Sequence, residues 1–375
     1  MEKQVSYSIS VDFTPWSENG YMVIDLRLFE EIGGELAKGT MNLEFVGTDE
    51  AFDNLLKQYT GKLIIKKEAV VVMTIDIFII KRKFNKNFLS IEFLCLKDIK
   101  FVTELISLEH SDITTALESL YPGNIDIRCT SDISNDTPVL QFMETNHSFC
   151  NKMAYSFKKD IIFGYSWEGF FLKDRIGEKN SKGEVETADN TNIAFIGGGG
   201  GHEPLDPYSI KYNNLLYKKS WDPWTETESE EDDSEVASAN FTPINSKTIK
   251  FYDNYLTLGT SHYCFAENYL YNKARMTDNM YAAFRVEVKD IPNYKLGDVV
   301  HYRYLNEAKE NIKIPYEYFL VKTNELYISV SEDSAKKTKS DVFWVSTLVS
   351  LVDHNGALLP ETDPMIEISE DGKIS

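Results

Sequence analysis

Glu168 and Asp174 flank a predicted β-hairpin and come closest, among the residues of this sequence, to a pair that could do chemistry. Two carboxyl groups can hydrolyse a glycosidic bond when the fold holds them a few ångströms apart, one as general acid and the other as base or nucleophile. Sequence spacing does not set that separation, and a chain with 59 acidic residues offers such pairs by chance. We therefore interpret the pair as structural and predict that the chain is not an enzyme, with glycan cleavage as the open alternative.

Metal and phosphate chemistry have weaker support. Five glycines at 197–201 precede His202 and Glu203 but lack the Lys-Ser/Thr of a phosphate-binding loop. The acidic run 226–235 has contiguous acids and no central glycine, unlike a calcium-binding loop. None of the six histidines has HxxxH or HxH spacing. We predict no catalytic, cofactor-binding or metal-ligating residue, and interpret both runs as mobile tips of a long loop.

Aromatic side chains, at 13% of the sequence, favour strands and large packed interfaces. Two tryptophans lie between the glycine run and the acidic run, where their rings could stack on sugars or anchor the loop to a barrel or a neighbouring subunit. We favour the anchor, and a glycan-binding protein stays open. The predicted interface residues are those two tryptophans and the aromatic residues of the hairpin: Phe163, Tyr165, Trp167, Phe170, Trp221 and Trp224.

The composition narrows the class of partner and compartment. A formal net charge of −20 repels phosphates, so we predict no specific nucleic-acid binding. Four widely spaced cysteines without a CxxC pair fit a reducing compartment. The N-terminus lacks the apolar core of a signal peptide, and no window approaches 18 consecutive apolar residues, so we expect no membrane span.

The runs rich in β-branched and aromatic residues predict two β-barrel-like domains. The first domain, residues 1–100, is expected to be a closed or nearly closed barrel of about six strands, which would remove exposed edges. Its predicted elements are a short helix at 51–58 and strands at 21–29, 41–46, 63–66, 70–81 and 88–96. The second domain, residues 246–350, has a predicted helix at 261–276 and strands at 281–288, 316–322, 325–330 and 343–351, with a turn at Thr323-Asn324.

A small α/β module is predicted between the barrels, at residues 101–175. Its first helix spans 112–120, and Asn146 is expected to cap the second, in which three residues form an apolar stripe: Phe149, Met153 and Phe157. Strands at 161–165 and 170–172 then form a hairpin with Gly169 in the turn. Residues 176–245 are predicted to be a long excursion with the two mobile tips, and residues 351–375 an acidic C-terminal tail. The predicted fold class is mainly β with an α+β insertion.

Three stretches, in this order and spacing, resemble the baseplate hub proteins of contractile-tailed phages, the late-control-D family also found at the base of type VI secretion spikes. They are Leu89–Glu104, Gln141–Arg175 with its helix and hairpin, and Lys273–Tyr304, which contains the turn Leu296-Gly297-Asp298-Val299-Val300. The glycine run, the acidic run and the acidic tail depart from the family pattern.

The resemblance implies a homotrimer in the tail baseplate of a virion, made in the host cytoplasm. Two similar barrels per chain would give a ring with approximate six-fold symmetry. Such a ring joins a hexameric tail tube to a three-fold central spike, and DNA passes through its channel. Its implied partners are the tail tube protein, the central spike protein and baseplate wedge proteins. Another all-β tail adaptor ring is the remaining alternative.

Overall fold

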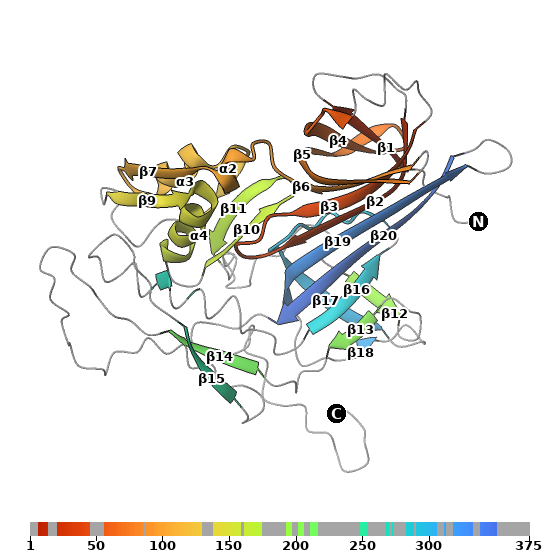
Figure 1. Cartoon of the computed structure of the whole chain (residues 1–375). Coiled ribbons are helices and arrows are strands. Elements are labelled where there is room, and N and C mark those ends of the chain that lie inside the picture. The colour runs from red at the N-terminus through yellow and green to blue at the C-terminus, as the bar shows by residue number, and fades with distance from the viewer. Residues whose placement is uncertain are drawn as a thin grey trace, which may run out of the picture.

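The computed structural model describes residues 7–13, 21–45, 56–85, 88–129, 138–158, 161–174, 193–196, 202–205, 211–216, 248–253, 268–269, 272, 283–288, 290–305, 311–312, 318–332 and 338–350. Most of the helices predicted at 51–58 and 261–276, both predicted mobile tips and the acidic tail lie outside these ranges. Within them the chain is mainly β, which confirms the predicted fold class (Figure 1).

Residues 7–94 form six strands in the described ranges: β1 Tyr7–Phe13, β2 Tyr21–Glu31, β3 Lys38–Phe45, β4 Thr60–Lys67, β5 Val70–Asn85 and β6 Phe88–Leu94. The C-terminal part contributes β16 Ala283–Val288, β17 Val299–Leu305, β18 Asn311–Ile312, β19 Tyr318–Glu332 and β20 Thr338–Ser350. Between them lie β12 Ile193–Ile196, β13 His202–Leu205 and a separate two-stranded sheet of β14 Lys211–Leu216 and β15 Thr248–Asp253. Each of the five strands that the sequence predicts within residues 1–100 overlaps one of the strands β2 to β6.

One sheet of 13 strands unites the two ends of the chain, in the order β1-β4-β5-β6-β3-β2-β19-β20-β16-β13, with β17 on β19 and β12 and β18 on β17. The joint is the antiparallel pairing of β2 with β19, from Glu31↔Thr323 to Asp25↔Ser329. The sheet curls so that β1 comes close to β20, where the Tyr7 backbone N–H donates to the Ser340 hydroxyl at 2.7 Å. Strands from residues 7–94 and strands from residues 318–350 therefore belong to one curled sheet.

β19 corrects one prediction. The sequence predicted two strands joined by a turn at Thr323-Asn324, whereas β19 runs unbroken through both residues with only a register shift between Val321 and Thr323. Asn324 is fully buried, and its side chain bonds to Glu30 and Ser346. Asparagine in a sequence often indicates a turn, but here its side-chain hydrogen bonds allow it to be buried inside the sheet.

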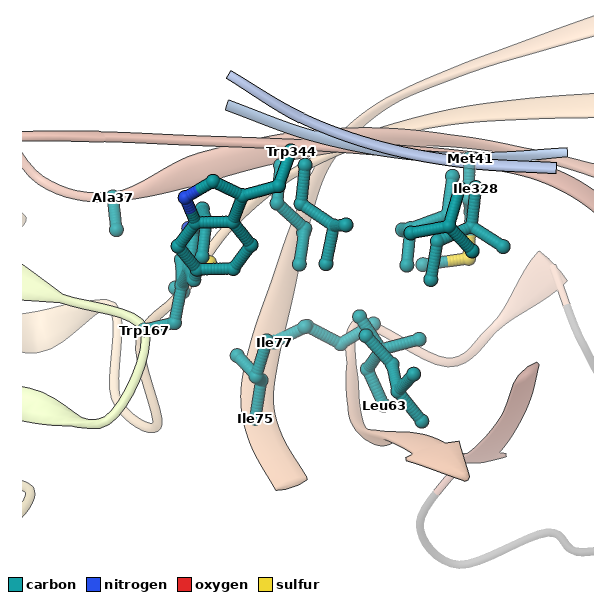
Figure 2. Close-up of a cluster of buried hydrophobic side chains, with 14 of the residues drawn as sticks. Ala37, Met41, Leu63, Ile75, Ile77, Trp167, Ile328 and Trp344 are labelled. Atoms are coloured by element: carbon teal, nitrogen blue, oxygen red, sulfur yellow. The ribbon is translucent and has the colours of Figure 1, made fainter. Parts of the chain in front are cut away.

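The curled sheet encloses an apolar core (Figure 2). Alternate residues along β4 point inward, so that Leu63 and Ile65 are buried, whereas Ile64 between them is only partly buried and Lys62 is exposed. Core side chains come from both ends of the chain: Met41, Leu63, Ile75 and Ile77 from the N-terminal strands, Ile328 and Trp344 from β19 and β20. Burial of this shared core stabilises the joint between the two groups of strands.

The α/β module lies beside the curled sheet (Figure 1). Its elements are α2 Lys100–Thr103, β7 Leu105–His110, α3 Ile113–Leu120, β8 Ile125–Ile127, β9 Val139–Thr145, α4 Asn146–Ser156, β10 Ile161–Ser166 and β11 Gly169–Asp174. The strands form the sheets β10-β11-β8 and β7-β9. The predicted apolar stripe is confirmed, since Phe149, Met153 and Phe157 are all buried in the module core.

The N-terminus of α4 differs from the prediction by one residue. Thr145, with extended backbone, caps the helix by accepting the Ser148 N–H on its hydroxyl at 3.1 Å. Asn146 is the first helical residue, and its side-chain oxygen instead accepts from the Gln141 amide at 2.9 Å. Threonine and asparagine both favour capping positions, so the residue types alone could not decide between the two neighbours.

Asp112 caps α3, and its replacement with alanine is expected to destabilise the chain by about 1 kcal/mol. The Asp112 carboxylate accepts the Thr115 N–H at 2.8 Å and the Thr115 hydroxyl at 2.8 Å, and both bonds are lost in the variant. Urea unfolding of Asp112→Ala against the wild type measures the loss. Asp112→Asn keeps a capping oxygen and is the control; equal losses in both variants would contradict a capping role.

Candidate assembly surfaces

The carboxylates Glu168 and Asp174 lie far apart. Glu168 is in the turn of the β10–β11 hairpin, whereas Asp174 is at the other end of β11, opposite Ile161. Five residues of strand separate Gly169 from Asp174, which corresponds to about 17 Å. Each carboxylate also binds a lysine, Glu168 with Lys295 at 2.5 Å and Asp174 with Lys158 at 2.8 Å. This spacing exceeds that of either glycosidase mechanism, and the pair belongs to the salt bridges that hold the hairpin in place.

The four aromatic residues predicted on the hairpin are buried within the chain. Phe163, Tyr165 and Phe170 lie in the module core, at 0 to 2% exposure, and Trp167 is 5% exposed. Their side chains therefore have almost no surface left for direct contact with another chain. Any effect they have on an assembly acts through the shape of the core. The other two predicted interface residues, Trp221 and Trp224, lie outside the described residues.

Trp167 lies in the turn between β10 and β11, and its side chain packs in the core of the curled sheet (Figure 2). Its ring meets Trp344 of β20 edge to face, with the ring centroids 5.3 Å apart. Its backbone N–H donates to the buried Glu30 carboxyl at 3.0 Å. A single residue in the turn of the module's hairpin thus contacts a strand from each end of the chain, β20 through its ring and β2 through its backbone N–H.

A network of buried, hydrogen-bonded side chains lies around the contact between Trp167 and Trp344. The Asn324 amide donates to Glu30 at 2.8 Å, and the Ser346 hydroxyl donates to the Asn324 oxygen at 2.7 Å. The Trp344 indole N–H donates in turn to Ser346 at 2.9 Å. Burial raises the pKa of Glu30 to about 7, against the lowering effect of its bonds to Asn324 and Trp167. The network fixes β2, β19 and β20 relative to the hairpin.

The turn at 296–300, part of the resemblance, docks on the other side of the hairpin. Gly297 has a φ of 73°, a backbone conformation that residues with a Cβ rarely adopt. A Cβ at this position would also lie 2.8 Å from the Phe171 ring, so both the backbone conformation and the available space require glycine. The Gly297 N–H donates to the Val321 carbonyl, and Lys173 of β11 forms a salt bridge with Asp298 at 2.8 Å. The module is therefore fixed to β17 and β19 as well as to β2.

Two surfaces expose large apolar side chains. The first is the start of β5 at Val70, Val71 and Val72, with exposures of 67, 51 and 39%. We call it the hairpin patch because it lies at the tight connection of β4 with β5, which is a different hairpin from β10–β11 of the module. The second, the ribbon patch, covers the two-stranded sheet of β7 and β9 and consists of Leu105, Leu108, Leu140, Phe142 and Met143, which are 45 to 70% exposed. The sequence predicted a strand at 70–81 but not which of its apolar residues face outward, and it predicted no strand at β7 or β9.

An aromatic groove of about 460 Å³ crosses the joint between β2 and β19 on the outer face of the sheet. Phe29, Tyr327 and Phe343 line it, with Tyr327 stacked on Phe343 at 6.2 Å and the Arg27 guanidinium 5.0 Å from the Tyr327 ring centre. The groove exists only because strands from the two ends of the chain pair here, so no local sequence signal could reveal it. Such faces are typical of surfaces that pack against other proteins.

Within the described ranges, no three His, Cys, Asp or Glu side chains come together in a way that could hold a metal ion. Among the same residues, no helix has both the length and the apolar character needed to cross a membrane.

Comparison with known proteins identifies the fold. No protein-family model matches the sequence, and no curated protein is similar to it in sequence. Two solved structures match nearly the whole chain: the 43 kDa tail protein of prophage MuSo2 from Shewanella oneidensis and a tail protein from Neisseria meningitidis MC58. The first has a TM-score of 0.52 over 96% of this chain and 100% of its own, and the second 0.50 over 96% and 99%. Each is 10% identical to this chain. The chain therefore has the fold of these two tail proteins.

Proposed function

We propose that this chain is a non-enzymatic structural component of a phage tail or a related injection system, and that three copies form a hub ring joining the tail tube to the central spike. The observation that carries the proposal is the whole-chain match to two tail proteins, which extends over 96% of the residues. The hub assignment itself rests on the sequence resemblance. The tail tube, spike and baseplate wedge proteins are its proposed partners, and the virion baseplate its proposed location.

The physical character of the chain supports a role in assembly. The hairpin patch, the ribbon patch and the aromatic groove present apolar surface, which soluble proteins rarely leave uncovered over large areas. The module is fixed to the curled sheet by the Trp167 contact and the Lys173–Asp298 salt bridge. A net charge of −20 is also suited to a channel wall along which DNA passes without binding.

The oligomeric state tests this proposal. Sedimentation velocity or mass photometry of the purified chain is expected to give a species of three times the single-chain mass, because a hub ring needs three copies. The same sample is expected to leave purified cell-wall glycan intact. A monomer that cleaves the glycan would overturn the proposal in favour of a lytic tail protein, and a ring of six chains would favour a different tail adaptor.

A further inference from the structure

The ribbon patch lies on a sheet of only two strands. Among the described strands, β7 and β9 pair only with each other, so each of them has one edge without a strand neighbour. In Figure 1 these two strands lie at the left end of the molecule, on the far side of the module from the curled sheet. Two strands alone are marginally stable in water, and a free edge favours the addition of a further strand. A strand from another chain can therefore extend this sheet.

A β-bulge in β9 displays two large apolar side chains to solvent. The register shifts between Ile106 and Leu108 of β7, so that one residue there lies opposite two residues of β9, Phe142 and Met143. These two side chains are 70 and 63% exposed, and Met143 has a φ of 48°, which is uncommon for a residue other than glycine. Gln141, next to them, is fully buried, and its amide donates to the backbone carbonyl three residues later at 3.1 Å. The outward position of both side chains is thus fixed by the fold.

The surroundings of the ribbon patch are acidic. Residues 97–152 contain nine acids and four Lys or Arg, and two of those four cations already have acidic partners at 2.6 and 2.7 Å. Neither β7 nor β9 contains a Lys or Arg. Glu109 lies directly across the strand pair from Leu140, and Glu104 immediately precedes β7. Both glutamates are exposed, and within the described ranges neither has a basic partner. Exposed apolar side chains therefore lie beside unpaired negative charge.

We propose that the ribbon patch binds a segment of a different protein that carries both basic and apolar side chains, and that this segment adds to the ribbon as a further strand. The inference rests on the proposed role in an assembly, and it names a surface and the chemistry of one partner. Apolar side chains of the segment cover Leu140 and Phe142, and its Lys or Arg pair with Glu104 and Glu109. A second copy of this chain is a poor match, because a net charge of −20 makes copies repel one another.

Three synthetic peptides test the proposed chemistry. The first, Val-Thr-Lys-Thr-Val-Thr-Lys-Thr-Val, places valine and lysine on one face when it is extended. The second has glutamate in place of both lysines, and the third has serine in place of the three valines. Fluorescence anisotropy of each labelled peptide, titrated with the whole chain, gives the dissociation constants. We expect the second and third peptides to bind at least about tenfold more weakly, because one brings like charges together and the other lacks the apolar contact.

Charge reversal in the chain locates the binding site. Glu104→Lys/Glu109→Lys is expected to weaken binding of the lysine peptide at least about tenfold, and to bind the glutamate peptide within about threefold of the original pair. Glu68→Lys/Asp341→Lys makes the same change in net charge at exposed positions outside the module. This control is expected to alter binding of the lysine peptide less than about threefold, which separates the proposed site from general attraction to an acidic protein.

Removal of apolar side chains supplies the second comparison. Leu140→Ser/Phe142→Ser is expected to weaken binding of the lysine peptide at least about tenfold. Val70→Ser/Val71→Ser removes two exposed apolar side chains from the hairpin patch and is expected to have no such effect. Thermal melting shows whether each variant is folded. A lysine peptide that binds no better than the other two peptides would overturn the proposal, as would folded ribbon variants that bind it like the wild type.

Sedimentation velocity of the same proteins separates this inference from the proposed function. A trimer that binds the lysine peptide, and that stays a trimer in the ribbon variants, supports both. A trimer that does not bind the peptide would remove this inference and leave the hub in place. A trimer that is lost in folded ribbon variants would make the ribbon patch a contact between copies, which also overturns the inference. A monomer that binds the peptide at the ribbon would support the inference and remove the three-copy ring.

Discussion

Replacing Trp167 with alanine is expected to lower the free energy of unfolding by about 3–5 kcal/mol, the range for truncating a large buried aromatic side chain. Trp167 is 5% exposed and is the only residue of its hairpin that belongs to the core of the curled sheet rather than to the cores around the module. The variant loses the edge-to-face contact with Trp344 and leaves a cavity where three elements meet. The α/β module is then expected to open from the sheet before the rest of the chain unfolds.

Guanidinium unfolding followed by far-UV circular dichroism measures the loss, and hydrogen exchange of the hairpin amides measures the opening. Trp167→Phe is the informative control. The Trp167 indole N–H is buried without a hydrogen-bond partner among the described residues, so phenylalanine removes an unsatisfied donor worth about 1–3 kcal/mol while it keeps most of the apolar volume. We expect Trp167→Phe to lose less than half as much as Trp167→Ala. Equal losses in both variants would show that the indole shape, and not apolar filling, is what the joint requires.

The local structure of the module was predictable because its signals lie close together in the sequence. The stripe of Phe149, Met153 and Phe157 has helical spacing, and Gly169 marks the hairpin turn. Gly169 has a φ of 145°, and a Cβ there would lie 2.3 Å from the Asn124 carbonyl oxygen, which explains why the turn needs glycine. These features depend on a few neighbouring residues, and each element agrees with its own sequence.

Pairings between distant parts of the chain were not predictable in the same way. The pairing of β2 with β19 brings together residues nearly 300 positions apart, and no pattern within either strand indicates which strand it pairs with. Asn324 shows the consequence, since it suggested a turn although its amide is bonded to Glu30 across that joint. The burial of Phe163 and Tyr165 has the same origin: aromatic residues suit cores and interfaces equally, and the choice depends on what else packs against them.

The stability of the chain is expected to fall by about 2–3 kcal/mol between pH 5 and pH 8 because of Glu30. Burial raises the pKa of this carboxyl to about 7 in the folded chain, against 4.5 for an ordinary glutamate. The folded state therefore keeps the Glu30 proton in a range where the unfolded state has already lost it. The stabilisation is fully present below about pH 4.5, declines through the range between the two pKa values, and is lost above about pH 7.

Glu30→Gln isolates this effect, because the amide has a similar shape but no titratable proton. Its one side-chain oxygen can accept from Asn324 or from Trp167 but not from both in the present geometry, so the variant loses one hydrogen bond, and this loss is the same at every pH. The charges that face Glu30 are Glu168, which raises its pKa further, and Lys295, which lowers it, and both remain in the variant. Burial lowers the pKa of His147, which makes stability rise with pH below the ordinary value for histidine. That contribution has the opposite sign and cancels when the two proteins are compared.

Urea unfolding at intervals from pH 5 to pH 8 measures the difference between wild type and Glu30→Gln. We expect the free energy of unfolding of Glu30→Gln to rise relative to that of the wild type as the pH rises, until the two curves become parallel above about pH 7. Glu118→Gln, at an exposed position on α3, controls for the loss of one negative charge and is expected to follow the wild type throughout. Curves for wild type and Glu30→Gln that stay parallel from pH 5 would mean that Glu30 ionises freely inside the joint. That joint would then have to admit water or a cation between β2, β19 and the hairpin.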